Sequence, residues 1–359
     1  MLNFFTRYFF PKEIVIKKGS LQRLKFLDIS KPIIIYSTSS EKNGNIEKIK
    51  SFFPKNTLLK INSGEPKLSF IQSYVDISKN DAIIAIGGGS VIDSAKLLMA
   101  RCLSEDNISS LKPFTLKDGN STKPFFVAIP TTVGSGAESD GVAVYENENK
   151  KTPLISDLLV PDLAILDSSL VADLPENILI TTALDAYSHG FESYFSRMTN
   201  EFSKILSTAA CGDIYFSLDS DGSSHDIEKL LYSSYLAGLA QSVTSVGLIH
   251  AISHTISPIC KISHGHINSL LIIPVMKFYK DKDLDIDSFL KKQGIDGLNH
   301  LEEKIGSLLK SNNIVMVDKN SLTINDDLIQ DIKNDICFKT SPVLPNSEEI
   351  IKILESIIE

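Results

Sequence analysis

The chain of 359 residues is poor in cysteine, lacks long apolar runs and carries no excess of basic charge. No stretch reaches the roughly 18 apolar residues that span a bilayer, and Arg7 and Pro11 interrupt the aromatic-rich start before it reaches signal-peptide length. The net charge of −8 argues against a protein that binds nucleic acid by neutralising phosphates. The sequence therefore predicts a cytoplasmic protein that binds a small-molecule substrate, with neither a membrane span nor a nucleic-acid partner.

The few cysteines form no C-x-x-C pair and no pattern typical of a disulfide framework. They are Cys102, Cys211, Cys260 and Cys337. Reduced thiols are the ordinary state in the cytoplasm, so we expect the fold to depend on apolar burial instead. A chain of this length with 43% hydrophobic residues can bury a large core and is expected to form about two domains.

The first 172 residues alternate short apolar runs with helical patterns, which is typical of a parallel sheet covered by helices. The isoleucine-rich runs of 31–37 and 81–87 are continuous, as in strands that are buried on both faces. Further strands are predicted at 13–19, 56–62 and 124–132, and helices at 66–80 and 91–103. Residues 173–359 are mostly helical in pattern, and a ligand site is expected in the cleft between the two domains.

Glycines separate the strand predicted at 81–87 from the helix that follows it. The turn contains Gly87, Gly88, Gly89 and Ser90. Glycines let a backbone approach a pyrophosphate, and the free amides of a helix N-terminus face the anion. The G-x-G-x-x-G fingerprint is absent, so a tight turn that requires positive φ is the alternative.

A second polar turn begins at the end of the strand predicted at 124–132. It contains Thr131, Thr132 and Ser135. Such a sequence is also typical of an ordinary hydroxyl-rich loop. Two polar glycine turns after strands of one sheet favour a shared cradle for phosphate and ribose.

Only seven histidines occur in the chain, yet four of them lie between positions 250 and 266. His250 and His254 are four residues apart, as are Asp185 and His189, so each pair shares one face of a helix. Either pair alone is equally typical of hydrogen-bonded or core side chains. Together with His264 in a Ser-His-Gly turn, they predict a site for Zn²⁺ or Fe²⁺. Asp185, His189, His250 and His264 as ligands would leave a net charge of about +1 to polarise a substrate oxygen.

These motifs together resemble the iron-containing (group III) alcohol dehydrogenase family. The matching stretches are "GGGSVIDSAK", "IPTTVGSGAES", "ALDAYSHGFESY", "GLIHAISHTI" and "HGHINSLLIIP". The resemblance implies a Rossmann-like α/β domain in 1–172 that binds a dinucleotide, an all-α domain in 173–359, and a divalent metal in the cleft. Ser263, His266 and Asp140 depart from the family pattern, which affects the substrate site more than the metal.

The resemblance also implies roles for individual residues. The metal ligands fall on Asp185, His189, His250 and His264, and the metal is expected to be Fe²⁺, with Zn²⁺ as the alternative. His254 falls where the family has a histidine that faces substrate and nicotinamide; it either relays the hydroxyl proton or orients the metal site. The cofactor positions fall on Gly88, Gly89, Ser90, Asp93, Thr131, Thr132 and Lys151.

The end of the strand predicted at 31–37 bears on the choice of cofactor. NAD sites usually place a carboxylate there for the ribose 2′-hydroxyl, whereas this chain has Ser37 followed by further hydroxyl residues. A 2′-phosphate is not repelled by serine, so NADP is favoured over NAD. Glu41 and the absence of a nearby arginine in the sequence weaken this preference.

The predicted function is hydride transfer between NAD(P)H and a small polar alcohol or aldehyde, such as a sugar-acid alcohol or a phosphonate aldehyde. The alternative is an NAD- and metal-dependent cyclase or lyase of the dehydroquinate synthase kind. That alternative requires a glutamate ligand and clustered basic residues, and the few basic residues of 173–275 are scattered. A non-catalytic metal-binding protein would leave the glycine turns unexplained. The enzyme is expected to form a homodimer.

Overall fold

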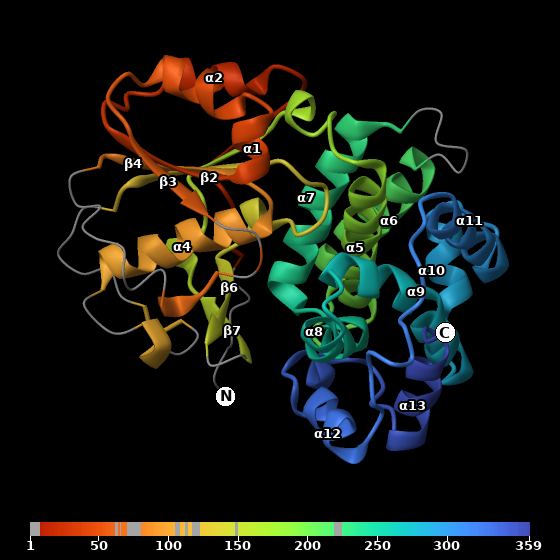
Figure 1. The fold of residues 1–359 in the computed structure, drawn as a ribbon. Coiled ribbons are helices and arrows are strands. Elements are labelled where there is room, and N and C mark those ends of the chain that lie inside the picture. Colours follow the sequence, from red (N-terminus) through yellow and green to blue (C-terminus); the bar gives the residue numbers. More distant parts are fainter. Residues whose placement is uncertain are drawn as a thin grey trace, which may run out of the picture. The chain divides into compact units, whose positions relative to one another are not determined.

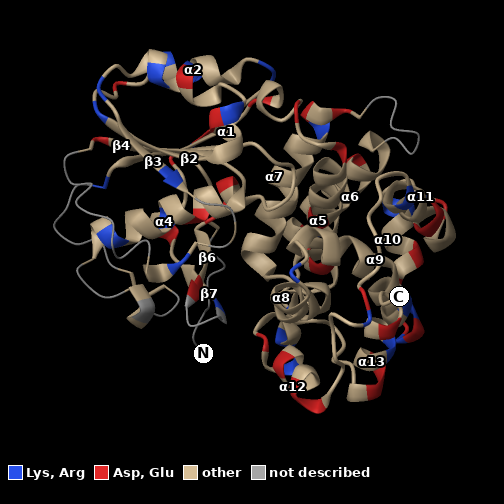
Figure 2. Cartoon of the chain, in the orientation of Figure 1, with Lys and Arg blue, Asp and Glu red and all other residues tan. Residues whose placement is uncertain are grey.

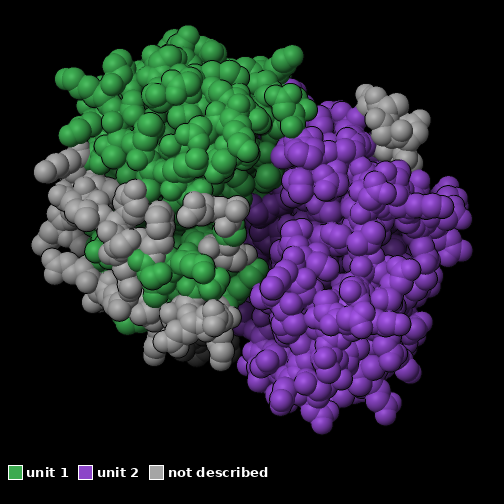
Figure 3. Space-filling model, viewed as in Figure 1, with its two compact units in different colours: residues 1–132, 136–173 green, residues 133–135, 174–359 purple. Residues whose placement is uncertain are grey.

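The computed structural model describes residues 8–61, 64, 66–69, 80–104, 108–111, 114–116, 123–147, 150–218 and 225–359. The chain forms two compact units (Figure 3). The first contains residues 1–132 and 136–173, and the second contains 133–135 and 174–359. The sequence prediction placed a single boundary after residue 172 and did not include the return of 133–135 to the helical unit.

The first unit is built on a parallel six-stranded sheet in the order β1-β8-β5-β4-β2-β3 (Figure 1). Its strands are β1 (Glu13–Ile16), β2 (Pro32–Ser37), β3 (Thr57–Ile61), β4 (Ala82–Gly87), β5 (Phe125–Pro130) and β8 (Leu163–Leu166). β6 (Val142–Asn147) and β7 (Lys150–Ile155) form a separate antiparallel hairpin. The predicted parallel sheet is confirmed.

Alternate residues of the central strands enter two different cores, one on each face of the sheet. Ile83 and Ala85 of β4 pack with α4 (Gly89–Leu103), whereas Ile84 and Ile86 pack with α2 (Asn45–Phe52). The continuous apolar runs of the sequence follow from this two-sided burial. Figure 1 shows α4 and α2 on opposite faces of the sheet. Of the helix predicted at 66–80, residues 70–79 lie outside the described part.

The carboxyl ends of neighbouring parallel strands bring Ser37 and the starts of the two predicted cofactor turns to one edge of the sheet. β2, β4 and β5 are neighbours, and they end at Ser37, Gly87 and Pro130. Short helices follow or connect the strands: α1 (Thr38–Lys42) and the 3₁₀ turns η1 (Ser20–Phe26), η3 (Ile108–Ser110), η4 (Ala137–Ser139), η5 (Asp157–Leu159) and η6 (Ser168–Leu170). This edge is where open α/β sheets bind nucleotides.

The second unit is helical and is organised around α5 (Glu176–Phe195). The helices that follow are α6 (Glu201–Ser217), α7 (Ile227–Thr244), α8 (Leu248–Cys260), α9 (His264–Asp281), α10 (Ile286–Lys292), α11 (Leu298–Ser311), α12 (Asp326–Asn334), η7 (Cys337–Thr340) and α13 (Ser347–Glu355). Figure 2 shows few charged residues on α7 and α8 and many on α11, α12 and α13. This distribution matches the burial of α7 and α8 that their apolar pattern predicted.

No single helix of the described chain is long and apolar enough to cross a membrane. α7 and α8 reach that length and composition only as a pair, and they are bent by 102° at the break between them.

Candidate functional site

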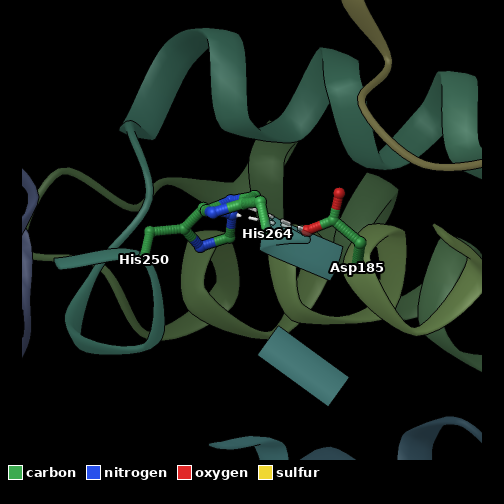
Figure 4. A group of neighbouring side chains, drawn as sticks. All are labelled: Asp185, His250 and His264. Carbon is green, nitrogen blue, oxygen red and sulfur yellow. Dashed lines mark ion pairs between the residues drawn. The ribbon is translucent and has the colours of Figure 1, made fainter. Parts of the chain in front are cut away.

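Three helices of the second unit bring the predicted metal ligands together. α5 carries Asp185 and His189 on one face, α8 carries His250, and α9 begins at His264. The Nε2 atoms of the three histidines lie 3.8, 3.7 and 3.9 Å from Asp185 Oδ1, respectively. Figure 4 shows His250 and His264 directed at the Asp185 carboxylate. Three imidazole nitrogens therefore surround one carboxylate oxygen.

These distances suit a shared cation better than direct hydrogen bonds. At 3.8 Å, Asp185 and His189 are too far apart for the hydrogen-bonded pair that their spacing also allowed. Ligands of a tetrahedral ion with bonds of about 2.1 Å lie about 3.4 Å apart. Asp185, His250 and His264 each offer one donor atom, and these three atoms lie within 4.8 Å of one another. His189 lies beside this group, with its ring stacked on His250 at 4.7 Å between centroids.

The outer nitrogens of two histidines are held by hydrogen bonds that direct Nε2 inward. His250 Nδ1 lies 2.6 Å from Glu192 Oε2, and His264 Nδ1 lies 2.7 Å from Ser253 Oγ. Buried His189 Nδ1 has no hydrogen-bond partner within the described part of the chain. Metal-binding histidines usually have such an outer partner, because it fixes the ring and its tautomer. Two of the three imidazoles are thus preoriented as a metal site requires.

Glu192 also fixes the start of α8. Its carboxylate accepts hydrogen bonds from the amides of Gly247 and Ile249, at 2.9 and 2.5 Å. Burial raises the pKa of Glu192 to about 7, although these amides act in the opposite direction. Sequence reasoning missed this residue. It follows Asp185 by seven positions and so lies on the same helical face, which is a signal that spacing alone could have supplied.

Asn268 is a second residue that the sequence analysis missed. Its Nδ2 donates to Asp185 Oδ1 at 2.6 Å and lies 3.2 and 2.9 Å from Nε2 of His250 and His264. The amide nitrogen therefore lies against the same three atoms that a divalent cation would bind. Asn268 is four residues after His264, so helical spacing again pointed to it. The donor set and its convergence fit a divalent ion of the Fe²⁺ or Zn²⁺ type.

His254 lies beside this group and is bound on its other side by a carboxylate. Its ring stacks on His264 at 5.1 Å between centroids, and its Nδ1 lies 3.1 Å from Asp335 Oδ2. Asp335 Oδ1 accepts a hydrogen bond from the amide of Cys337. Burial raises the pKa of Asp335, but hydrogen bonding to His254 outweighs this effect and holds the pKa below its usual value. Asp335 is 81 positions away from His254, and no sequence pattern connected the two.

In the first unit, the two polar turns predicted to form a cradle lie side by side. The Thr131 amide donates to the Gly87 carbonyl at 3.0 Å. A Cβ at Gly88 would lie 3.3 Å from Thr132 Cγ2, and one at Gly87 would lie 2.5 Å from Val91 Cγ2. Gly88 has φ −75°, so the interpretation that this turn requires positive φ is wrong. Glycine is needed here because a Cβ would crowd the side chains of Val91 and Thr132.

Other predicted cofactor residues occupy distinct positions. Asp93 Oδ2 accepts a hydrogen bond from the Val144 amide at 3.1 Å, which ties α4 to β6. Lys151 lies on β7, opposite Glu146 of β6. Ser135 belongs to the helical unit, where its carbonyl accepts a hydrogen bond from Gln241. The structure therefore places Ser135 in a different compact unit from Thr131 and Thr132.

At the end of β2, the Ser37 hydroxyl caps α1. It accepts a hydrogen bond from the Ser40 amide at 3.2 Å and lies 2.8 Å from Ser39 Oγ. Lys60 on β3 is the neighbour that sequence reasoning missed, and its Nζ donates to Glu41 Oε2 at 2.6 Å. Because Lys60 pairs with Tyr36 across the β2–β3 ladder, register brings a cation to this edge without any sequence signal.

A buried group of charges lies between α4 and the loop before β6. Lys96 is fully buried and binds Asp140 Oδ1 at 2.7 Å and the Val142 carbonyl at 2.6 Å. Asp140 was noted as a departure from the family pattern, and the buried Lys96 ammonium accounts for it. Glu138 is buried nearby, and its Oε1 has no hydrogen-bond partner in the described chain.

Glu138 is expected to make stability depend on pH. Burial raises its pKa to about 7 from 4.5, so between these values the folded chain binds a proton that the unfolded chain releases. The contribution of protonated Glu138 to the free energy of unfolding is therefore complete below about pH 4.5 and is lost as pH rises through about 7. Between about pH 5 and pH 8 the wild type should lose roughly 2 kcal/mol relative to Glu138→Gln. Urea unfolding of both proteins across this range measures the difference, and parallel curves would contradict the assignment.

Comparisons with known proteins identify the family of this chain. The model of the iron-containing alcohol dehydrogenase family matches residues 11–168, and that of the C-terminal region of the Fe-containing alcohol dehydrogenase family matches 179–358. An NADPH-dependent butanol dehydrogenase from Clostridium saccharobutylicum is 28% identical over 98% of this chain and 97% of its own length.

Solved structures share the fold over nearly the whole chain. An iron-containing alcohol dehydrogenase from Thermococcus thioreducens has a TM-score of 0.84 at 24% identity, covering 98% of this chain and 99% of its own. A sulfoacetaldehyde reductase from Bifidobacterium kashiwanohense, in complex with NAD⁺, has a TM-score of 0.85 at 21% identity, covering 99% of each chain. With the two family models spanning most of the sequence, this chain belongs to the iron-containing alcohol dehydrogenase family and is an NAD(P)-dependent oxidoreductase of alcohols and aldehydes.

Proposed function

We propose that this enzyme transfers a hydride between NADPH and a small polar aldehyde or alcohol, with a divalent cation held by Asp185, His189, His250 and His264. The observation that carries the proposal is the approach of three Nε2 atoms to within 3.7–3.9 Å of Asp185 Oδ1. Iron is the proposed metal. Zinc binds such ligands more tightly than ferrous iron, so it is the expected substitute in purified protein.

A divalent cation supplies Lewis acidity that stabilises negative charge on the substrate oxygen. The surrounding side chains hold the ligand set in place before substrate arrives. Glu192 and Ser253 fix the rings of His250 and His264 through their Nδ1 atoms. Preorganised ligands need little rearrangement during reaction, which lowers the barrier.

His254 is proposed to move the hydroxyl proton. The Asp335 carboxylate beside Nδ1 favours the tautomer with the proton on Nδ1, which leaves the Nε2 lone pair available. That nitrogen accepts a proton from an alcohol or returns it to the product of aldehyde reduction. The side chain of His254 is 20% exposed, so the proton can pass on to water.

The dinucleotide is proposed to bind at the edge formed by β2, β4 and β5. The turn of Gly88, Gly89 and Ser90 begins α4, and its free backbone amides are proposed to bind the pyrophosphate. Thr131 and Thr132 adjoin this turn and supply hydroxyls. Asp93 and Ser135 are proposed to support the two turns through their hydrogen bonds with Val144 and Gln241. Lys151 is proposed to reach the ribose.

NADP is the proposed cofactor because Ser37 offers a hydroxyl where NAD sites usually have a carboxylate. Lys60, which pairs with Glu41, is proposed to turn its ammonium toward a 2′-phosphate. Replacing Ser37 by aspartate should lower the kcat/KM for NADPH relative to NADH by roughly 100-fold, since like charges in contact cost several kcal/mol. Aspartate also caps helices well, so α1 should remain intact. Initial rates with both cofactors measure the ratio. A wild type that prefers NADH, or an unchanged ratio in the variant, would contradict this assignment.

A polar substrate fits the polar side chains beside the proposed metal ligands. His254 and Asp335 are both partly exposed next to His264. The structural relative that is named a sulfoacetaldehyde reductase supports a small aldehyde with an acidic group, such as a phosphonate aldehyde or a sugar-acid aldehyde. The enzyme is also proposed to act in the cytoplasm as a homodimer.

The test is a substrate panel with metal-analysed protein. Small aldehydes with and without sulfonate, phosphonate or carboxylate groups are reduced with NADPH or NADH, and nicotinamide absorbance is followed. The proposal predicts the highest kcat/KM for an acidic aldehyde with NADPH. Faster reduction of simple aliphatic aldehydes would overturn the substrate class. Family membership already argues against the cyclase alternative.

A further inference from the structure

A second group of potential ligands lies next to the proposed metal site. His254, Asp335 and Cys337 each offer one donor atom, and the three atoms lie within 4.8 Å of one another. His254 belongs to α8, whereas Asp335 directly follows α12 and Cys337 begins η7. None of the three belongs to the proposed ligand set of the first site.

The segment from Asp335 to Thr340, which includes η7, is held against α8. The Cys337 amide donates to Asp335 Oδ1 at 2.7 Å, and the Thr340 hydroxyl donates to the Val246 carbonyl just before α8. The His254 and Asp335 donor atoms are 3.1 Å apart, close to the roughly 3.4 Å between two ligands of a tetrahedral ion. Two of the three donors therefore have suitable spacing without rearrangement of the backbone.

The chemistry of the three donors is specific. A thiolate, an imidazole and a carboxylate together suit Zn²⁺ or Co²⁺ better than Mg²⁺ or Ca²⁺, which prefer oxygen ligands. Cys337 is buried, and the Asp335 carboxylate nearby opposes a second negative charge on sulfur. A bound cation would remove that repulsion. The side chains of His254 and Asp335 are 20% and 18% exposed, which gives an ion access from solvent.

We propose that His254, Asp335 and Cys337 form a second cation site that takes Zn²⁺ or Co²⁺ and inhibits the enzyme when it is occupied. On binding, the Cys337 thiol releases one proton to solvent and its sulfur bonds to the cation. The cation takes the Nδ1 lone pair of His254, so the imidazole proton moves from Nδ1 to Nε2. Nε2 can then no longer accept a proton from substrate. This inhibition rests on the role of His254 given under Proposed function.

The experiment uses holoenzyme that already contains one equivalent of Co²⁺. The proposed first site has no sulfur ligand, so its absorption should contain no cobalt–thiolate charge-transfer band. A second equivalent of Co²⁺ should produce this band, and the metal content should then rise to nearly two equivalents per chain. Cys337→Ser should abolish the band and keep the first equivalent. Asp335→Asn should weaken the second equivalent at least about 10-fold, because it removes a charged ligand.

Cys260→Ser is the matched control. Cys260 is a partly exposed thiol at the end of α8 and is outside both ligand groups, so this variant should keep the band. A band that survives in Cys337→Ser, or no band at any Co²⁺ concentration, overturns the second site.

Zinc inhibition tests the second site and the proposed role of His254 separately. Excess Zn²⁺ should reduce the wild-type rate at least about 10-fold, and a weak chelator should restore the rate. Cys337→Ser should need at least about 10-fold more Zn²⁺ for the same fractional inhibition, measured against its own zinc-free rate. If the cobalt band appears but Zn²⁺ does not inhibit, the second site stands and the proton relay through His254 is wrong.

Discussion

Replacing His264 by alanine is expected to abolish stoichiometric metal binding and to reduce kcat/KM by about 1,000-fold or more. The variant removes one of three imidazoles that face Asp185 Oδ1, and a Lewis acid at the substrate oxygen contributes several kcal/mol to transition-state stabilisation. Metal analysis after dialysis and initial rates with a saturating cofactor measure the two effects.

His266→Ala is the matched control for this variant. His266 lies two positions further along α9, and its Nε2 contacts the Val315 carbonyl rather than Asp185. Its removal should leave the metal content near that of the wild type. Equal loss of metal in both variants, or full metal content in His264→Ala, would show that the proposed ligand set is wrong.

Glu192→Ala should weaken metal binding although it removes no proposed ligand. The change leaves the amides of Gly247 and Ile249 and the Nδ1 of His250 without their buried acceptor. We expect a loss of about 3 kcal/mol in the free energy of unfolding, because buried unpaired donors are costly. Metal affinity should fall about 10- to 100-fold, as is usual when the outer partner of a metal-binding histidine is lost.

Chelator competition and urea unfolding of the metal-free protein separate these two effects. Glu176→Ala is the control on the same helix, since Glu176 lies in the first turn of α5 and binds the distant His225. It should change metal affinity by less than about 2-fold. Unchanged metal affinity in Glu192→Ala would mean that His250 does not depend on this carboxylate for its orientation.

Local patterns predicted the elements of the fold well where burial is two-sided. The isoleucine runs of β2 and β4 had to be strands covered on both faces, and the two cores confirm this. The return of residues 133–135 to the helical unit was not predictable. It depends on Gly134, where a Cβ would lie 2.9 Å from Thr182 of α5, and sequence periodicity does not report such an approach.

Helical spacing could predict those residues of the candidate metal site that share one face of a helix. Asp185 and His189 share a face by simple periodicity, and Glu192 and Asn268 could have been found in the same way. Asp335 could not, because its contact with His254 depends on how α12 packs against α8. Lys60 was missed for a similar reason, since strand register brings it to the end of β2. Contacts between distant segments need the tertiary structure.

The most direct measurement is anomalous diffraction from crystals of the protein that contain one equivalent of Zn²⁺ or Fe²⁺. We expect one anomalous peak, from an ion bonded to Asp185 and to the Nε2 atoms of His189, His250 and His264, with no sulfur ligand. A single peak elsewhere in the chain, or a peak that excludes Asp185 and these three imidazoles, would contradict the metal site on which the proposed chemistry depends.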